Sequence, residues 1–259
     1  MTNSDPNVSA SYLKNVAKLA ANIKQRSYEL MNINAGDCVL DVGCGPGVDL
    51  PALVERVGDQ GKVYALDNDA DMLREAKQQA VKYPEVLEFR EADVAQVPFT
   101  EKAFNAVRAE RLFQVLPRHY DQWQVASELS RILKNRGRLV LVDTDWASAS
   151  VNFSNAELER RLLNFFAVQL RPNGFAGRQL SELAQQAGLQ ISVQEITPLY
   201  SDNLDQSPFA DWLPTEAEKA GICSANEAQL WRTELADRAR QGRFYSCVNI
   251  VSVCAVRMH

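Results

Sequence analysis

The sequence predicts an α/β fold in which a mostly parallel sheet of seven strands carries helices on both faces and a helical lid. Three observations support this prediction. Between residues 38 and 143, short apolar runs of strand character alternate with segments whose apolar residues recur at helical spacing. A glycine-rich turn follows the first of these runs, and two helical segments interrupt the alternation after residue 145. Such alternation is typical of βαβ units, which place parallel strands side by side.

The expected strands are rich in Val, Leu, Ile and Cys and cover residues 38–43, 62–67, 87–92, 104–109, 138–143, 189–197 and 244–257. Helices are expected at residues 12–31, 70–82, 122–133 and 181–187.

Two longer segments have helical patterns of their own. Ser154 to Glu157 and Ser224 to Glu227 each have the spacing of a capping box, which predicts that a helix begins there. The chain is therefore expected to form one domain (1–259) with an N-terminal helical cap (1–34). Helical inserts at 146–177 and 201–243 are expected to form a pocket.

Composition and charge narrow the classes of function. The net charge of −5 and the absence of a Lys/Arg run argue against a nucleic-acid partner. No run of 18 apolar residues and no signal-peptide core are found, which predicts a cytoplasmic protein that does not enter a membrane. The five cysteines form no CxxC pair, and the only histidines are His119 and His259, so reduced thiols and no metal site are expected.

The glycine turn has the pattern GxGxG over residues 43–47. Residues without a Cβ let the backbone turn sharply or approach a ligand closely, and ligands of parallel sheets bind beyond the carboxyl ends of the strands. Val48 stands where a dinucleotide fingerprint has its third glycine. The turn is therefore expected to hold a nucleoside without phosphate, with the ribose hydroxyls on Asp67 at the end of the second strand.

Several stretches of the chain resemble the class I S-adenosylmethionine-dependent methyltransferases. "VLDVGCGPG" is similar to the first motif of that family, "VYALDNDADML" to its ribose-binding strand, and "FREADVAQVPF" to its adenine-binding segment. "ERLFQVLP" and "RILKNRGRLVLVDTDW" are similar to the regions of strands 4 and 5. The resemblance covers residues 36–146 and is strongest to small-molecule enzymes like those of quinone biosynthesis. It implies a Rossmann-like fold, S-adenosylmethionine as cofactor, and in-line methyl transfer to a nucleophilic O, N or C atom of a small-molecule metabolite.

The resemblance also implies which residues surround the cofactor. They are Asp41, Gly43, Cys44, Gly45, Asp67, Asn68, Met72, Asp93, Val94, Glu110 and Arg111. Asp41 would help to orient the ammonium group of the cofactor, Asp67 would hold its ribose, and Asp93 would accept a hydrogen bond from its adenine. Glu110 and Arg111 would border the sulfonium.

The acceptor side of the site is less well defined. Relatives often carry a histidine where Val115 stands, so a general base, if one is used, would have to be another residue. Asp145 and His119 are the candidate catalytic residues, and Glu110 and Tyr12 could also serve as the base. The alternatives are a capping side chain at Asp145 and a solvated loop histidine at His119, and for His119 the solvated side chain is favoured. The candidate substrate contacts are Tyr12, Trp146 and Phe166.

Some alternatives stay open. The arginines at 160, 161, 171 and 178 are expected to form a solvated face, and anchoring of an anionic substrate is the alternative. A Rossmann dehydrogenase is disfavoured by Val48. A relative that binds the cofactor without catalysis remains possible, as does a methyltransferase acting on protein or RNA. The sequence defines neither the acceptor nor the oligomeric state.

Overall fold

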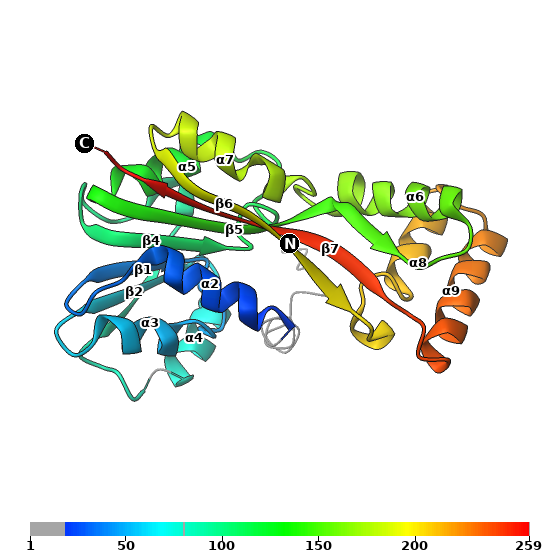
Figure 1. Cartoon of the computed structure of the whole chain (residues 1–259), viewed down its shortest axis with the longest axis horizontal. Coiled ribbons are helices and arrows are strands. Elements are labelled where there is room, and N and C mark those ends of the chain that lie inside the picture. The colour runs from blue at the N-terminus through cyan, green and yellow to red at the C-terminus, as the bar shows by residue number, and fades with distance from the viewer. Residues whose placement is uncertain (1–18, 80, 259) are drawn as a thin grey trace.

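The computed structural model describes residues 19–79 and 81–258 (Figure 1). Its strands are β1 (Cys38–Val42), β2 (Lys62–Asp67), β3 (Leu87–Glu91), β4 (Phe104–Glu110), β5 (Leu133–Val151), β6 (Gln190–Ser201) and β7 (Ser246–Val256). They form one sheet in the order β3-β2-β1-β4-β5-β7-β6. Strands β1 to β5 are parallel, whereas β7 runs antiparallel to both β5 and β6. The predicted fold class is confirmed.

The helices are α2 (Ala21–Met31), α3 (Leu50–Val57), α4 (Ala70–Gln79), α5 (Gln122–Arg131), α6 (Ala156–Phe165), α7 (Ala176–Gln186), α8 (Trp212–Lys219) and α9 (Ala225–Arg240). Three short helices are η1 (Val94–Gln96), η2 (Phe166–Leu170) and η3 (Leu204–Gln206). Successive side chains of a strand point to opposite faces, so the sheet has a core on each side. Helices α2, α3 and α4 cover one face, and α5 and α7 cover the other.

A third core lies beyond the sheet, where β5 and β7 extend to the lobe that contains α6, α8 and α9 (Figure 1). Trp146, Phe166 and Trp231 are its large buried residues. This lobe is the helical lid expected from the sequence. Strand β5 is longer than the predicted 138–143, because Ser150 and Val151 still pair with β7. The first insert therefore begins after residue 151 and not at residue 146.

One of the two predicted capping boxes forms and the other does not. Ser224 and Glu227 form the complete box at the start of α9. At α6 the prediction was wrong, since Asn155 caps the helix by accepting from the amides of Glu157 and Leu158. The Ser154 side chain is instead bonded to Glu234 of α9 and so ties the two lid helices together.

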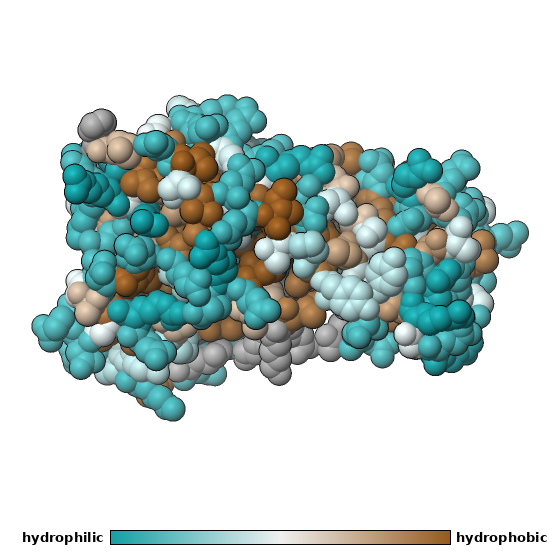
Figure 2. Space-filling model, in the orientation of Figure 1, coloured by the Kyte–Doolittle hydropathy of each residue, from teal (hydrophilic) through white to brown (hydrophobic). Residues whose placement is uncertain are grey.

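The visible face in Figure 2 is hydrophilic over the helices at both ends, and hydrophobic residues show between them in the left half and the centre. Among the described residues of the edge strand β6, Ile196 and Tyr200 are exposed.

Candidate functional site

The glycine turn follows β1 directly. Gly43, Gly45 and Gly47 have φ angles of +68°, +52° and +77°, which side chains with a Cβ rarely adopt. The amides of Gly43 and Cys44 both donate to the carbonyl of Leu66 at the end of β2, at 2.7 and 3.0 Å. The turn is thus fixed against the neighbouring strand.

A cavity of about 380 Å³ opens beside this turn. Its walls come from the segments that follow β2, β1 and β4, together with Lys24 of α2 and Arg171 beyond η2. Because β2, β1 and β4 are adjacent in the sheet, the cavity runs along the carboxyl ends of the strands, where ligands of parallel sheets bind.

Most of the residues expected around a cofactor line this cavity. They are Gly43, Cys44, Gly45, Asp67, Asn68, Met72, Val94, Glu110 and Arg111. Asp41 and Asp93 were also expected, but neither belongs to the cavity lining, although residues on either side of Asp93 do.

Asp67 is held by backbone donors. Its Oδ2 accepts from the amide of Gly45 at 2.8 Å and its Oδ1 accepts from the amide of Asp69 at 3.0 Å. Burial raises the pKa of Asp67, and these backbone hydrogen bonds oppose the rise. A carboxylate oxygen can accept more than one hydrogen bond, so the side chain retains acceptor capacity toward hydroxyl groups in the cavity.

Asp93 is connected to the cavity only through hydrogen bonds to neighbouring residues. Its Oδ1 accepts from the amide of Ala95 at the start of η1, at 2.8 Å. Its Oδ2 accepts from the hydroxyl of Tyr120 at 2.6 Å, and Tyr120 lines the cavity. No motif in the sequence points to Tyr120 as part of the site.

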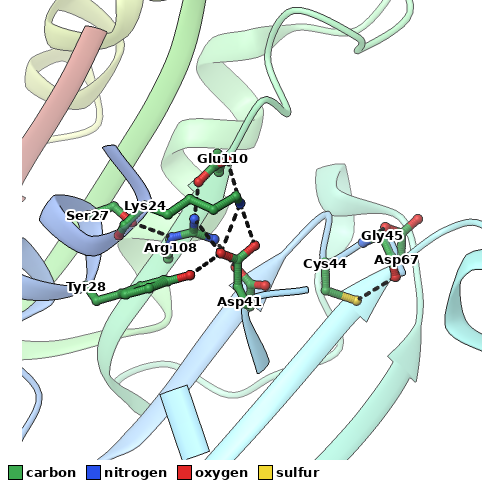
Figure 3. Close-up of polar contacts among 10 residues, drawn as sticks. Lys24, Ser27, Tyr28, Asp41, Cys44, Gly45, Asp67, Arg108 and Glu110 are labelled. Carbon is green, nitrogen blue, oxygen red and sulfur yellow. Dashed lines mark hydrogen bonds and ion pairs between the residues drawn. The ribbon is translucent and has the colours of Figure 1, made fainter. Parts of the chain in front are cut away.

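A buried charged cluster lies beside the glycine turn and consists of Lys24, Asp41, Asp49, Arg108 and Glu110 (Figure 3). The Arg108 guanidinium donates to Asp41 at 2.9 Å and to Asp49 at 3.2 Å, and it also contacts Glu110. Lys24 donates to Asp49 at 2.9 Å and to Glu110 at 2.7 Å. The cluster therefore joins α2, β1 and β4 to the start of α3.

The two aspartates of the charged cluster titrate differently. Burial raises the pKa of Asp41 to about 6, although the charge of Arg108 opposes the rise. Asp49 is also buried, but the charges of Arg108 and Lys24 lower its pKa to about 2. Asp41 Oδ2 has no hydrogen-bond partner among the described residues.

Gln114 and Arg171 also form part of the cavity wall. The indole N–H of Trp146 donates to Gln114 Oε1. The Arg171 guanidinium carbon lies 4.9 Å from the Trp146 ring, 4.6 Å from Phe166 and 5.6 Å from Trp212. Arg171 is only 6% exposed, so its expected place on a solvated face was wrong. The aromatic rings of the lid enclose its side chain.

The comparisons with known proteins agree with this geometry. Residues 39–137 match a family model described as a methyltransferase domain. The chain is 30% identical over 253 residues to an uncharacterized 37.1 kDa protein in transposon TN4556 of Streptomyces fradiae, with 95% of this chain and 70% of that protein covered. It is 34% identical over 115 residues to a demethylmenaquinone methyltransferase of Oceanobacillus iheyensis, with 44% of this chain and 47% of that enzyme covered.

The chain belongs to the class I S-adenosylmethionine-dependent methyltransferases. Its cofactor is S-adenosylmethionine. The chain spans about half the length of the demethylmenaquinone methyltransferases that it matches.

A solved structure has the same fold as the methyltransferase. Geranyl diphosphate C-methyltransferase of Streptomyces coelicolor A3(2), crystallised with Mg²⁺, geranyl diphosphate and S-adenosyl-L-homocysteine, aligns with a TM-score of 0.58 at 16% identity. The alignment covers 98% of this chain and 87% of that one.

In the part of the methyltransferase that the structure describes, no helix is long and apolar enough to cross a membrane. Within the same residues, no cluster of three or more His, Cys, Asp or Glu side chains is placed to hold a metal ion.

The structure does not bring the candidate catalytic residues into the cavity. The Asp145 carboxylate is bound by Arg178 through two hydrogen bonds of 3.0 and 2.8 Å and does not line the cavity. His119 is exposed beside Tyr120, with 5.1 Å between the ring centroids, and it too lies outside the lining.

The candidate substrate contacts that the structure describes do not line the cavity. Trp146 and Phe166 are buried behind the wall, where they contact Arg171, and Tyr12 lies outside the described residues. The second insert, 201–243, contributes no described residue to the cavity lining, but its Trp212 packs on Arg171.

Proposed function

We propose that the enzyme transfers the methyl group of S-adenosylmethionine to a nucleophilic O, N or C atom of a small-molecule metabolite bound in the cavity. The observation that carries the proposal is the cavity itself, which joins the glycine turn and Asp67 to the wall formed by Gln114 and Arg171. When bound, the cofactor supplies an electrophilic methyl group, which the acceptor receives by in-line displacement as the sulfur keeps the bonding electrons. The relative named for demethylmenaquinone supports a small-molecule acceptor.

The residues of the cavity fit the cofactor. Asp67 retains acceptor capacity for the ribose hydroxyls, and the glycine backbone leaves room for close approach. Met72 and Val94 offer apolar surface for the adenine. Asp41 Oδ2 has no partner in the part of the chain that the structure describes, so a water between it and the ammonium group would satisfy a buried oxygen.

The protein contributes mainly by holding the two reactants together. Correct placement of reacting groups can supply on the order of 7–11 kcal/mol of the barrier. Asp145 is bound to Arg178 and His119 is exposed outside the lining, so we assign the role of general base to neither of them. Activity on a protein or RNA is the alternative, and the net charge of −5 disfavours the RNA. The cytoplasmic location stays a prediction.

The test is a calorimetric titration with S-adenosylmethionine, S-adenosylhomocysteine and NAD, using Asp67→Ala as the variant. Loss of the ribose hydrogen bonds to a charged acceptor should cost about 2 kcal/mol, or roughly a 30-fold weaker affinity for the first two ligands. Asp71→Ala is the matched control, because Asp71 is exposed at the start of α4 and does not line the cavity. Binding of NAD in preference to both other ligands, or unchanged affinity in Asp67→Ala, would refute the proposal.

A further inference from the structure

The cavity wall contains an aromatic ring that has no role so far. Among the described residues, Tyr120 is the only aromatic residue in the cavity lining. The segments that follow β2, β3 and β4 also contribute apolar side chains to this lining, namely Met72, Ala92, Val94, Leu116 and Pro117. An aromatic ring in an apolar wall offers a face on which a planar base can stack.

Tyr120 connects two segments that the sheet keeps apart. It follows β4, and its hydroxyl donates to Oδ2 of Asp93, just after β3, at 2.6 Å. Strands β2 and β1 lie between β3 and β4, and neighbouring strands are about 4.8 Å apart. The segment after β4 therefore extends past the ends of β1 and β2, and the hydrogen bond fastens it on the β3 side of the cavity.

The position of Tyr120 is fixed from both sides. Its amide donates to the carbonyl of Pro117 at 2.9 Å, and the next residue, Asp121, caps α5. Asp93 is held in turn, because its Oδ1 accepts from the amide of Ala95 at 2.8 Å. The hydrogen bond to Asp93 raises the pKa of Tyr120, so the hydroxyl remains a donor at neutral pH. The ring is thus placed before any ligand arrives.

The strand order indicates which part of the cofactor meets this ring. In the proposed function, Asp41 of β1 and Glu110 of β4 lie at the methionine end, and Asp67 at the end of β2 holds the ribose. A nucleoside that extends from β1 past β2 has its base on the β3 side. Tyr120 and Asp93 meet on that side, and the base is the only aromatic ring of S-adenosylmethionine.

We propose that the ring of Tyr120 binds the purine base of the cofactor and that Asp93 is a positioning residue that holds Tyr120. This inference rests on the proposed function. It replaces the direct contact with adenine that the family resemblance implies for Asp93, because Asp93 is exposed, lies outside the cavity lining and is bonded to Tyr120. Stacking does not require the amino group of adenine, since every base has a π face.

The test of the ring compares two ligands by calorimetric titration. S-Inosylhomocysteine differs from S-adenosylhomocysteine by an oxygen in place of the amino group of the purine. We expect Tyr120→Leu to weaken both ligands by a similar factor of about tenfold, because it removes the ring from the base. A crystal structure of the complex with S-adenosylhomocysteine should show the purine against the Tyr120 ring.

The test of the positioning role is a double-mutant cycle. Asp93→Ser keeps an oxygen that can cap η1, but its side chain is too short to hold the Tyr120 hydroxyl. We expect Asp93→Ser and Tyr120→Phe each to weaken both ligands about fivefold, and the double variant to be no weaker than either. Asp93→Asn retains an acceptor for the hydroxyl and should restore most of the affinity.

Tyr245→Leu is the control, because Tyr245 is exposed, stacks on Tyr200 and lies outside the cavity lining. Thermal unfolding of every variant separates misfolding from loss of the contact. The proposal is overturned if folded Tyr120→Leu keeps its affinity or if the purine lies away from the ring. It is also overturned if Asp93→Ser weakens only S-adenosylhomocysteine, if the wild type rejects S-inosylhomocysteine, or if the effects of Asp93→Ser and Tyr120→Phe add.

Failure of this proposal is distinguishable from failure of the proposed function. Binding of S-adenosylhomocysteine that depends on Asp67 but not on Tyr120 would refute the role of Tyr120 and leave the proposed function intact. A wild type that does not bind S-adenosylhomocysteine at all would refute both.

Discussion

At the scale of single residues, the charged cluster makes the stability of the protein sensitive to Arg108. Arg108→Met would leave the carboxylates of Asp41, Asp49 and Glu110 with one cation fewer, and we expect a loss of about 3–5 kcal/mol in the free energy of unfolding. Urea denaturation measures the change. Arg26→Met is the control, since Arg26 pairs with Glu195 on the surface, and we expect it to leave the free energy of unfolding almost unchanged. Similar losses in both variants would show that burial of Arg108 among carboxylates does not add to its contribution.

The sequence indicates the part of the cavity lining that follows the first strands, but not the wall formed by Gln114 and Arg171. The glycines and Asp67 lie next to predicted strands, so their spacing in the sequence indicates where they meet in space. Arg108 was missed because it is a lone charge inside an apolar strand, and its carboxylate partners come from β1 and the start of α3. Gln114 and Arg171 are joined through Trp146, a contact that no local pattern encodes.

At the scale of elements, the helical stripe after residue 154 was predicted, but its ending was not. The α6 helix passes into η2, a π-helix in which the amide of Arg171 donates to the carbonyl of Phe166 at 3.1 Å. Arg118 donates to the carbonyls of Val168 and Arg171, at 2.7 and 2.8 Å, and so caps this turn. These tertiary hydrogen bonds place Arg171 beside the cavity. Since apolar spacing reports only which helix face is buried, it could not reveal them.

Gly47 of the glycine turn has nearly the same φ angle as Gly188, which lies outside the turn, at +77° and +78°. In Gly47→Ala the new Cβ would lie 2.9 Å from Ala76 Cβ and from Leu50 Cδ1, where α3 and α4 meet. In Gly188→Ala the Cβ would meet nothing within 4 Å. Both variants bear the backbone cost of positive φ, about 1–2 kcal/mol. We expect Gly47→Ala to lose about 1–3 kcal/mol more in urea unfolding because of overpacking, whereas equal losses would show that the contact relaxes freely.

At the scale of the whole molecule, the sheet and its two helical layers followed from the alternation of strands and helices. The lid was predicted only in outline, since the extension of β5 toward it depends on its pairing with β7. Arg171 is the lid residue that lines the cavity, and rings from both inserts pack against it. In the proposed function, the sheet edge holds the cofactor and the lid shapes the acceptor wall.

The central claim is that one cavity holds the cofactor at the sheet edge with its reactive end toward Gln114 and Arg171. A crystal structure of the enzyme with S-adenosylhomocysteine tests this claim most directly. We predict that the ribose hydroxyls donate to Asp67, that the adenine lies beside Met72 and Val94, and that the sulfur faces the wall of Gln114 and Arg171. Density for the nucleoside at any other place, or with its sulfur turned away from that wall, would contradict the account.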